Sequence, residues 1–230
     1  MPDPASRRYG RRARHDALGR PAAVIPPQLR RSAAAAAIGC ALILLYLSVR
    51  HARTDRPGVL DAVVDAALRP GGSEHAAAAW MMIQLGDPLG ALVLTAMLAL
   101  AAHGTGRTPV AVLAVVAMPV TAAAVFALKP LVGRTLDGTL SFPSGHTAAV
   151  TTVAATTGLL MTSAFAGRVV VTALLCGAGT VGVASAMGSA LVMRGWHHAT
   201  DVAGGFCLAV CCVIALAFVL DRLDQAAERP

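Results

Sequence analysis

Charged residues are scarce in this chain, and lysine is almost missing. Only 13% of the 230 residues are charged, whereas a soluble domain of this size carries about 25%. Apolar residues make up 56%, and several uncharged runs reach or approach the ~20 residues that cross a bilayer as a helix. This composition excludes an ordinary soluble domain and predicts an all-α, polytopic membrane protein.

The five cysteines form no recognisable site. All of them fall inside apolar runs, and none has metal-ligand spacing to a nearby His or Asp. We therefore predict small buried residues and no disulfide framework. The chain also lacks the clustered carboxylates of a two-metal site, so we expect neither a metal nor another cofactor.

Positive charge is concentrated at the N-terminus. Residues 1–32 hold eight arginines against two aspartates and show no apolar periodicity, which predicts a basic, disordered cytoplasmic tail. Such a tail can bind nucleic acid, but beside a membrane span it is more typical of a segment that sets topology and contacts anionic lipid. We expect the bilayer as its partner and no nucleic acid.

Six apolar segments are predicted to cross the membrane within residues 33–222, as a six-transmembrane-helix bundle. Asp87-Pro88 and Thr108-Pro109 each have the pattern of a capped helix start followed by proline. The predicted spans are 33–49, 88–103, 108–128, 146–166, 169–193 and 202–220. A short charged cytoplasmic tail, residues 223–230, follows the last span.

Two further helical segments are expected beside the spans. Residues 59–68 place apolar side chains at helical spacing with Asp61 and Asp65 on another face, which predicts a short interfacial helix. Residues 76–85 are apolar and are followed by Gly86-Asp87-Pro88, so we expect a helix packed on the membrane face. A single kinked span over 76–103 is the competing interpretation.

Six spans put both termini on one side of the membrane, and the arginine-rich tail predicts that this side is cytoplasmic. The polar loops 51–75, 129–142 and 194–201 then all face outward. Because two spans separate the last two loops, the sequence predicts that these loops meet at the outer face.

The loop before residue 146 has the features of an anion site. Lys129, the only lysine, and Arg134 precede a turn made of Ser144, Gly145 and His146 at the start of an apolar helix. Helix N-termini offer unpaired N–H groups and a positive dipole end, and glycine lets an oxyanion approach the backbone. Taken alone, this turn is more often a simple helix cap.

The second loop supplies the missing partners. His197 and Asp201 are four residues apart, so the carboxylate can hold one ring nitrogen and leave the other free as a nucleophile or base. His198 is an alternative partner of Asp201, and simple anchoring of a helix end is a further interpretation. With Arg194 and the first loop, these groups suit phosphoryl transfer: cations and N–H groups hold the phosphate oxygens, one histidine attacks phosphorus and the other protonates the leaving oxygen.

Together these residues resemble the three motifs of the type 2 phosphatidic acid phosphatase family, integral membrane lipid phosphatases related to vanadium-dependent haloperoxidases. The motifs are Lys129, then Pro143-Ser144-Gly145-His146, then His197 with Asp201. The resemblance implies that His197 forms a phosphohistidine and is oriented by Asp201. It also implies that His146 is the acid for the leaving group, and that Lys129, Ser144 and Gly145 bind the phosphate.

Two arginines of the family pattern are displaced in this chain. The Arg-Pro that ends the first motif is replaced by Leu136 and Asp137, and the arginine place of the third motif holds Leu191. We expect Arg134 and Arg194 to substitute and bind phosphate. Arg194 lies three residues after Leu191, which is nearly one helical turn.

The sequence thus predicts metal-independent hydrolysis of a lipid phosphate or polyprenyl diphosphate by a multi-pass cell-membrane protein, with the site on the extracytoplasmic side. The resemblance implies a polyprenyl diphosphate, phosphatidic acid or phosphatidylglycerol phosphate as substrate, and the sequence does not choose among them. A phosphotransferase using the same site and a non-catalytic lipid-binding or transport relative are the alternatives.

Overall fold

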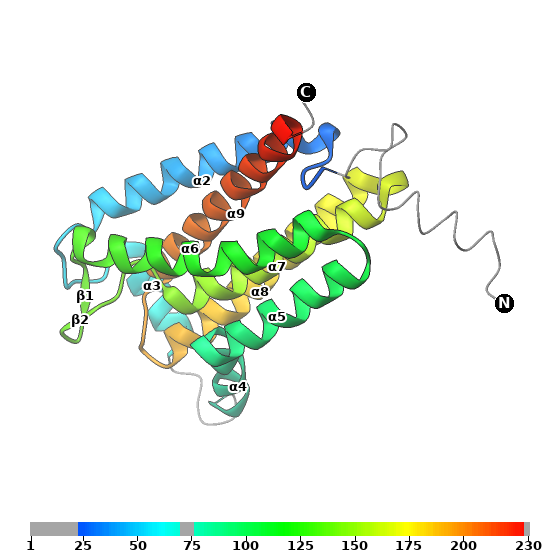
Figure 1. The fold of residues 1–230 in the computed structure, drawn as a ribbon. Helices are drawn as coiled ribbons and strands as arrows, with labels where there is room; N and C mark the ends of the chain where they lie inside the picture. The colour runs from blue at the N-terminus through cyan, green and yellow to red at the C-terminus, as the bar shows by residue number, and fades with distance from the viewer. Residues whose placement is uncertain (1–22, 70–75, 228–230) are drawn as a thin grey trace, which may run out of the picture.

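Eight α-helices are present in residues 23–69 and 76–227, the parts of the chain that this computed structural model describes (Figure 1). The longer helices are α2 (Arg30–Arg50), α5 (Pro88–Gly104), α6 (Thr108–Val132), α7 (Gly145–Ala164), α8 (Val169–Met193) and α9 (Ala199–Ala227). The shorter elements are α3 (Val59–Leu68), α4 (Ala76–Gly86) and the 3-10 turns η1 (Pro27–Leu29) and η3 (Ala166–Arg168). Strands β1 (Thr135–Leu136) and β2 (Thr139–Leu140) pair as a small antiparallel hairpin.

The helices have the length and composition of a multi-pass membrane protein. Four of them, α2 (with η1), α6, α8 and α9, are each long and apolar enough to cross a membrane, and α4 with α5 form a bent pair that raises the number to five. The all-α membrane architecture is confirmed. The predicted count of six spans is not, because α7 does not qualify by composition: seven of its side chains are Ser or Thr.

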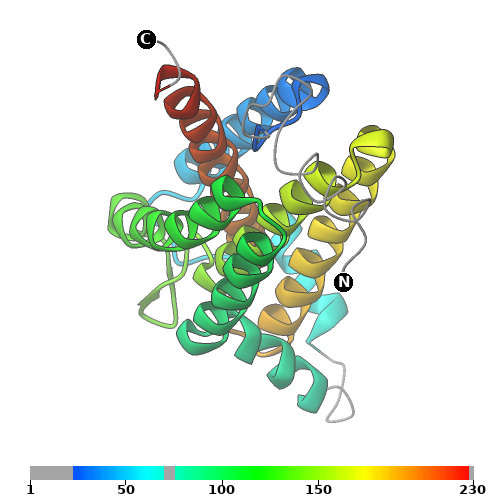
Figure 2. The same cartoon turned by 45° about the vertical axis from the view of Figure 1, so that its right-hand side comes forward.

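Helix α7 is polar because it is surrounded by protein. It packs against α4, α5, α6, α8 and α9, while α2 and α9 lie side by side at the edge of the bundle (Figures 1 and 2). Several of its hydroxyls find partners inside the bundle; Thr152, for example, donates to the carbonyl of Ala148 at 2.9 Å and lies 3.2 Å from the hydroxyl of Thr121. A helix enclosed in this way does not need an apolar surface toward lipid, and its hydroxyls can bond across helix contacts.

The segment between α6 and α7 is more ordered than the predicted loop 129–142. Helix α6 continues one turn further, to Gly133 in the left-handed region (φ 65°), whose N–H donates to the carbonyl of Lys129 at 2.8 Å. Lys129 therefore lies in the last helical turn. The hairpin that follows turns at Asp137 and Gly138, both with positive φ (48° and 77°), and this Asp-Gly pair is the sequence signal that the loop prediction missed.

The predicted break after residue 85 is confirmed. Helices α4 and α5 meet at 63°, with Asp87 at the N-cap position and Pro88 at the start of α5. The side chain of Asp87 makes no capping hydrogen bond, which leaves its carboxylate available for another partner.

Part of the predicted N-terminal tail is folded. Val24 and Ile25 are fully buried against an apolar cluster of α5, α6, α7 and α9, and their N–H groups donate to the carboxylate of Asp221 at 2.7 and 3.3 Å. Arg30, at the start of α2, pairs with the same carboxylate at 3.0 Å. Residues 1–22, the remainder of the predicted tail, lie outside the described residues.

Candidate active site

The end of the bundle opposite Asp221 collects the predicted functional residues. The hairpin, α3 and α4, the starts of α7 and α9, and the ends of α6 and α8 all lie at this end, from the hairpin on the left to α4 at the bottom in Figure 1. We call it the polar end.

The two predicted polar loops meet there. The N–H of Ser144 donates to the carbonyl of Asp201 at 3.0 Å. This contact is close because α9 has glycines facing the loop: a Cβ on Gly205 would overlap the carbonyl of Ser144, and one on Gly204 would overlap the ring of Phe142. The second and third motifs are therefore joined directly through the backbone.

Ser144 caps helix α7. Its Oγ accepts from the N–H of Thr147 at 3.4 Å, and its carbonyl accepts the N–H of Ala148. The N–H groups of Gly145 and His146 come before this first intrahelical bond. They are the donors that a helix start offers to an anion.

His146 has a carboxylate partner from the α4–α5 break. Its Nε2 lies 2.8 Å from Oδ1 of Asp87, the carboxylate that does not cap α5. The centroid of its imidazole also lies 6.0 Å from the ring centroid of Trp196. The ring of Trp196 in turn makes an edge contact with that of Trp80, with 6.2 Å between the centroids. Because Trp196 directly precedes His197, this contact brings the two predicted catalytic histidines into one neighbourhood.

His197 is buried beside Asp201. Its Nδ1 lies 3.6 Å from Oδ2 of Asp201, which is an ion-pair distance but too long for a hydrogen bond. Burial lowers the pKa of the His197 imidazole, and this effect outweighs the opposing influence of Asp201; the nearby charges of Lys129 and His146 lower the pKa further. His197 is therefore neutral near pH 7, the state that a nucleophilic nitrogen requires.

His198 is held by a different carboxylate. Its Nδ1 lies 3.0 Å from Oδ2 of Asp65 on α3, and its backbone N–H donates to Oδ2 of Asp201 at 3.0 Å. The Nε2 of His198 is buried and has no partner among the described residues. In His197 the buried nitrogen without a partner is instead Nδ1, which lies on the side of Asp201. Neither nitrogen of His198 is thus presented to an incoming group.

Arg134 is fully buried between two carboxylates. One terminal nitrogen donates to Oδ1 of Asp201 at 2.7 Å and to the hydroxyl of Thr200 at 2.6 Å. The other donates to Oδ2 of Asp61 at 2.7 Å. As placed, the guanidinium faces protein acceptors and not an open position.

Asp61 completes this network from α3. Its carboxylate also accepts the N–H groups of Thr200 at 2.9 Å and Gly58 at 3.1 Å. Burial alone would raise the pKa of Asp61. The hydrogen bonds from Arg134, Thr200 and Gly58 outweigh this effect and hold the pKa below its ordinary value. The carboxylate is therefore ionised over the physiological range.

Two further predicted phosphate ligands, Lys129 and Arg194, lie at the ends of α6 and α8. The Nζ of Lys129 donates one hydrogen bond, to the carbonyl of Leu140 at 2.8 Å. Arg194 is the C-cap of α8 and its side chain is exposed; the chain turns at Gly195 (φ 70°) immediately after it. Leu191, at the family's arginine place, is fully buried in an apolar cluster, so only Arg194 has its side chain outside the core.

Sequence reasoning missed three carboxylates of this site. The sequence does mark Asp61 and Asp65 as a pair, because their spacing of four residues puts both carboxylates on one face of α3. Asp87 was assigned to helix capping, and nothing in its local sequence distinguishes a cap from a histidine partner.

A sequence profile of the PAP2 superfamily matches residues 110–224, which includes every predicted motif. The crystal structure of the first transmembrane PAP2 type phosphatidylglycerolphosphate phosphatase from Bacillus subtilis is similar, with a TM-score of 0.61 and 19% sequence identity over 84% of this chain and 98% of that chain. At this identity the likeness concerns the fold. A comparison with curated proteins gives no match.

Proposed function

Because the chain belongs to the PAP2 superfamily and is a lipid phosphate phosphatase of that superfamily, we propose that it hydrolyses its substrate through a phosphohistidine on His197. The observation that carries this proposal is the hydrogen bond between Ser144 and Asp201. It joins the helix start that offers anion-binding N–H groups to the segment that holds the buried, neutral His197.

The reaction has two steps. In the first, the free ring nitrogen of His197 attacks phosphorus and the bond to the lipid oxygen breaks, while His146 gives its proton to that oxygen. In the second, water attacks phosphorus and the P–N bond breaks; His146 takes a proton from the water, and inorganic phosphate leaves. Asp201 stabilises the histidine ring as it gains positive charge, and Asp87 orients His146.

The phosphate is held by groups at the polar end. Lys129, which uses one of its three N–H donors on Leu140, supplies the other two. Arg194 and the backbone at Gly145 supply further donors, and Ser144 contributes mainly by holding this helix start in place. These cations and N–H groups carry the charge of the transition state, so the mechanism requires no metal ion.

Arg134 has a positioning role in this mechanism. Its contacts with Asp61 and Asp201 hold the Asp201 carboxylate beside His197 and keep it ionised. This differs from the direct phosphate contact expected from its place after Lys129.

We also propose that α7 is a sixth span, enclosed by the bent pair α4–α5 and by α6, α8 and α9, and that the polar end faces outward. The support is the alternation of helix directions along the chain together with the arginine-rich first segment, which favours a cytoplasmic N-terminus. A cysteine introduced at Asp137, exposed in the hairpin turn, should react with an impermeant thiol reagent on intact cells. Reaction only after permeabilisation would reverse this orientation.

The function is tested by phosphate release from purified protein with a chelator present. The substrates are phosphatidic acid, phosphatidylglycerol phosphate and a polyprenyl diphosphate, the classes expected from the family and from the Bacillus subtilis structure. We expect release from at least one of them, and loss of about 10³-fold or more in His197→Gln. The matched variant His198→Gln should lose less than about tenfold; the reverse order would move the nucleophile to His198, and strict dependence on a divalent ion would reject the mechanism.

A further inference from the structure

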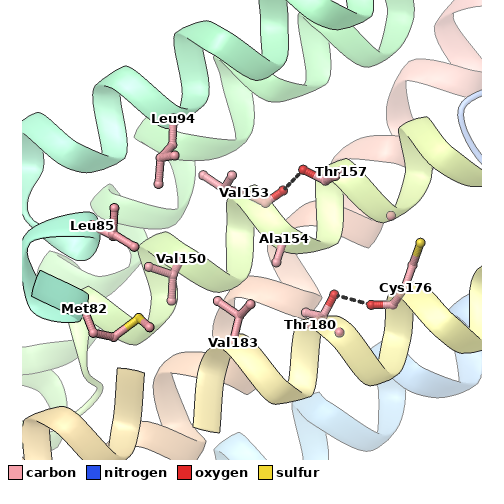
Figure 3. A pocket seen from close by; sticks show the side chains of 12 residues that line it. Met82, Leu85, Leu94, Val150, Val153, Ala154, Thr157, Cys176, Thr180 and Val183 are labelled. Atoms are coloured by element: carbon pink, nitrogen blue, oxygen red, sulfur yellow. Dashed lines mark hydrogen bonds between the residues drawn. The ribbon is translucent and has the colours of Figure 1, made fainter. Parts of the chain in front are cut away.

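An apolar groove runs along α7 between α5 and α8 (Figure 3). Its volume is about 360 Å³, within the range of small-molecule sites. Val150 and Ala154 form its floor on α7, Leu94 lies on the α5 side, and Gly179 and Val183 lie on the α8 side.

The groove has no polar group to offer a headgroup. The only hydroxyls that line it belong to Thr157 and Thr180, and each donates to a carbonyl of its own helix, Val153 and Cys176 respectively, at 2.8 Å (Figure 3). Both hydroxyls are therefore satisfied without a ligand. The occupant that such a surface fits is a hydrocarbon chain.

The groove begins next to the acid of the proposed reaction. Val150 is one helical turn below His146 on α7, and Gly158, the furthest lining residue on that helix, is twelve residues from His146, or about 18 Å. Met82 and Leu85 of α4 line the near end, and the Cβ of His146 would lie 3.0 Å from a Cβ on Gly86, the last residue of that helix. The groove therefore extends from the His146 side of the polar end into the apolar part of the bundle.

Large apolar side chains on the outer surfaces of α5 and α8 are exposed on either side, among them Val93, Leu174 and Leu175. In a membrane these surfaces contact lipid, so a chain can reach the groove from the bilayer.

We infer that the groove between α5, α7 and α8 binds the hydrocarbon tail of the leaving alcohol. This inference rests on the proposed function, because His146 protonates the oxygen that carries the lipid, and that oxygen must therefore lie on the His146 side. A chain attached there and directed along α7 lies in the groove, while the phosphate stays at the helix start. The substrate class is then a phosphate ester whose alcohol carries a chain long enough to span the groove.

Gly179 allows a direct test. A Cβ there meets nothing within 4 Å, so the backbone has room for a side chain, and Gly179→Leu places that side chain at the groove. Gly177 also meets nothing within 4 Å and does not line the groove, so Gly177→Leu is the matched control on the same helix. Each variant is assayed with a long-chain phosphatidic acid and with a soluble aryl phosphate that has no chain.

The expected result is a fall of roughly tenfold in kcat/KM for the long-chain substrate in Gly179→Leu, with the aryl phosphate unchanged and Gly177→Leu normal on both. An equal effect on both substrates, or none on either, overturns the groove assignment while the proposed function stands. If the wild-type protein cleaves neither substrate, the proposed function fails and the inference with it.

Occupancy is measured independently through Cys176, which lines the groove and is a free thiol. A non-cleavable long-chain phosphonate should slow alkylation of Cys176 by a membrane-permeant maleimide. Alkylation of Cys40, between α2 and α9, should be unaffected. Equal protection by phosphatidylcholine would mean that the groove holds any bilayer lipid, and would overturn the proposal.

Discussion

The carboxylate of Asp61 lies 2.7 Å from the guanidinium of Arg134, and both side chains are fully buried. This pair connects α3, a short helix outside the candidate spans, to Asp201 at the start of α9. The position of Asp201 beside His197 therefore depends on a residue that lies far from the catalytic motifs in sequence. A change in α3 should reach the site through Arg134.

We expect Asp61→Asn to lower the free energy of unfolding by about 1–3 kcal/mol, because Arg134 keeps Asp201 as its counter-charge but loses its charged hydrogen bond to Asp61. The change is measured by denaturant unfolding in detergent. Asp55→Asn is the control, since Asp55 is exposed and such surface changes stay within about 0.5 kcal/mol. A loss below about 1 kcal/mol would show that the pair does not support the fold.

The contact between Asp87 and His146 predicts a defect of a different kind. Asp87→Asn keeps the size of the side chain but removes the negative charge that faces Nε2 at 2.8 Å. We expect kcat to fall by about 10–100-fold with little change in stability, because a misplaced acid costs roughly this much. Asp137→Asn, in the exposed hairpin turn, should have normal kcat.

A larger loss of activity in Asp87→Asn than in His146→Ala would contradict this interpretation. Removal of the acid itself should cost about 10²–10⁴-fold, which sets the upper limit for its positioning partner.

Burial of His197 predicts how the protein responds to acid. An unfolded histidine has a pKa near 6.5, and burial lowers the pKa of His197 below that value. Below about pH 6.5 the unfolded chain binds a proton that the folded chain does not, so stability falls as the pH drops toward the folded pKa and then levels off. The acid limb of kcat/KM should likewise have its midpoint below about 6.5, because the neutral nucleophile persists to lower pH.

Both effects are measured on the same protein, by thermal unfolding and by kinetics across the pH range. In His197→Gln the fall in stability on acidification should be smaller, because the contribution of His197 is gone. Other buried histidines such as His51 continue to contribute to that fall. A kinetic midpoint above 6.5 would assign the acid limb to another group.

The sequence was most informative where a property is local. Helix α8 has the predicted limits, since its 25 uncharged residues lie between Arg168 and Arg194. The meeting of the two polar loops also followed from counting helices. The burial of Arg134 was not predictable in this way, because its partners Asp61 and Asp201 are 73 and 67 residues away. Whether a loop side chain is buried depends on segments far away in the sequence, and here α3 supplies Asp61, which helps to bury Arg134.

Arg134 and Arg194, the two arginines that lie near the family's displaced arginine places, should therefore respond differently to replacement by alanine. Arg194 is exposed at the end of α8, so Arg194→Ala should leave stability unchanged and raise KM by about 10–100-fold, the cost of a lost hydrogen bond to a charged phosphate. Arg134→Ala should instead unfold more readily, because Asp61 and Asp201 are left buried without their counter-charge. The control is Arg168→Ala, which removes an exposed arginine at the other end of the same helix and should change neither quantity. Steady-state kinetics with a lipid phosphate and unfolding in detergent measure both, and a normal KM in Arg194→Ala would remove Arg194 from the phosphate site.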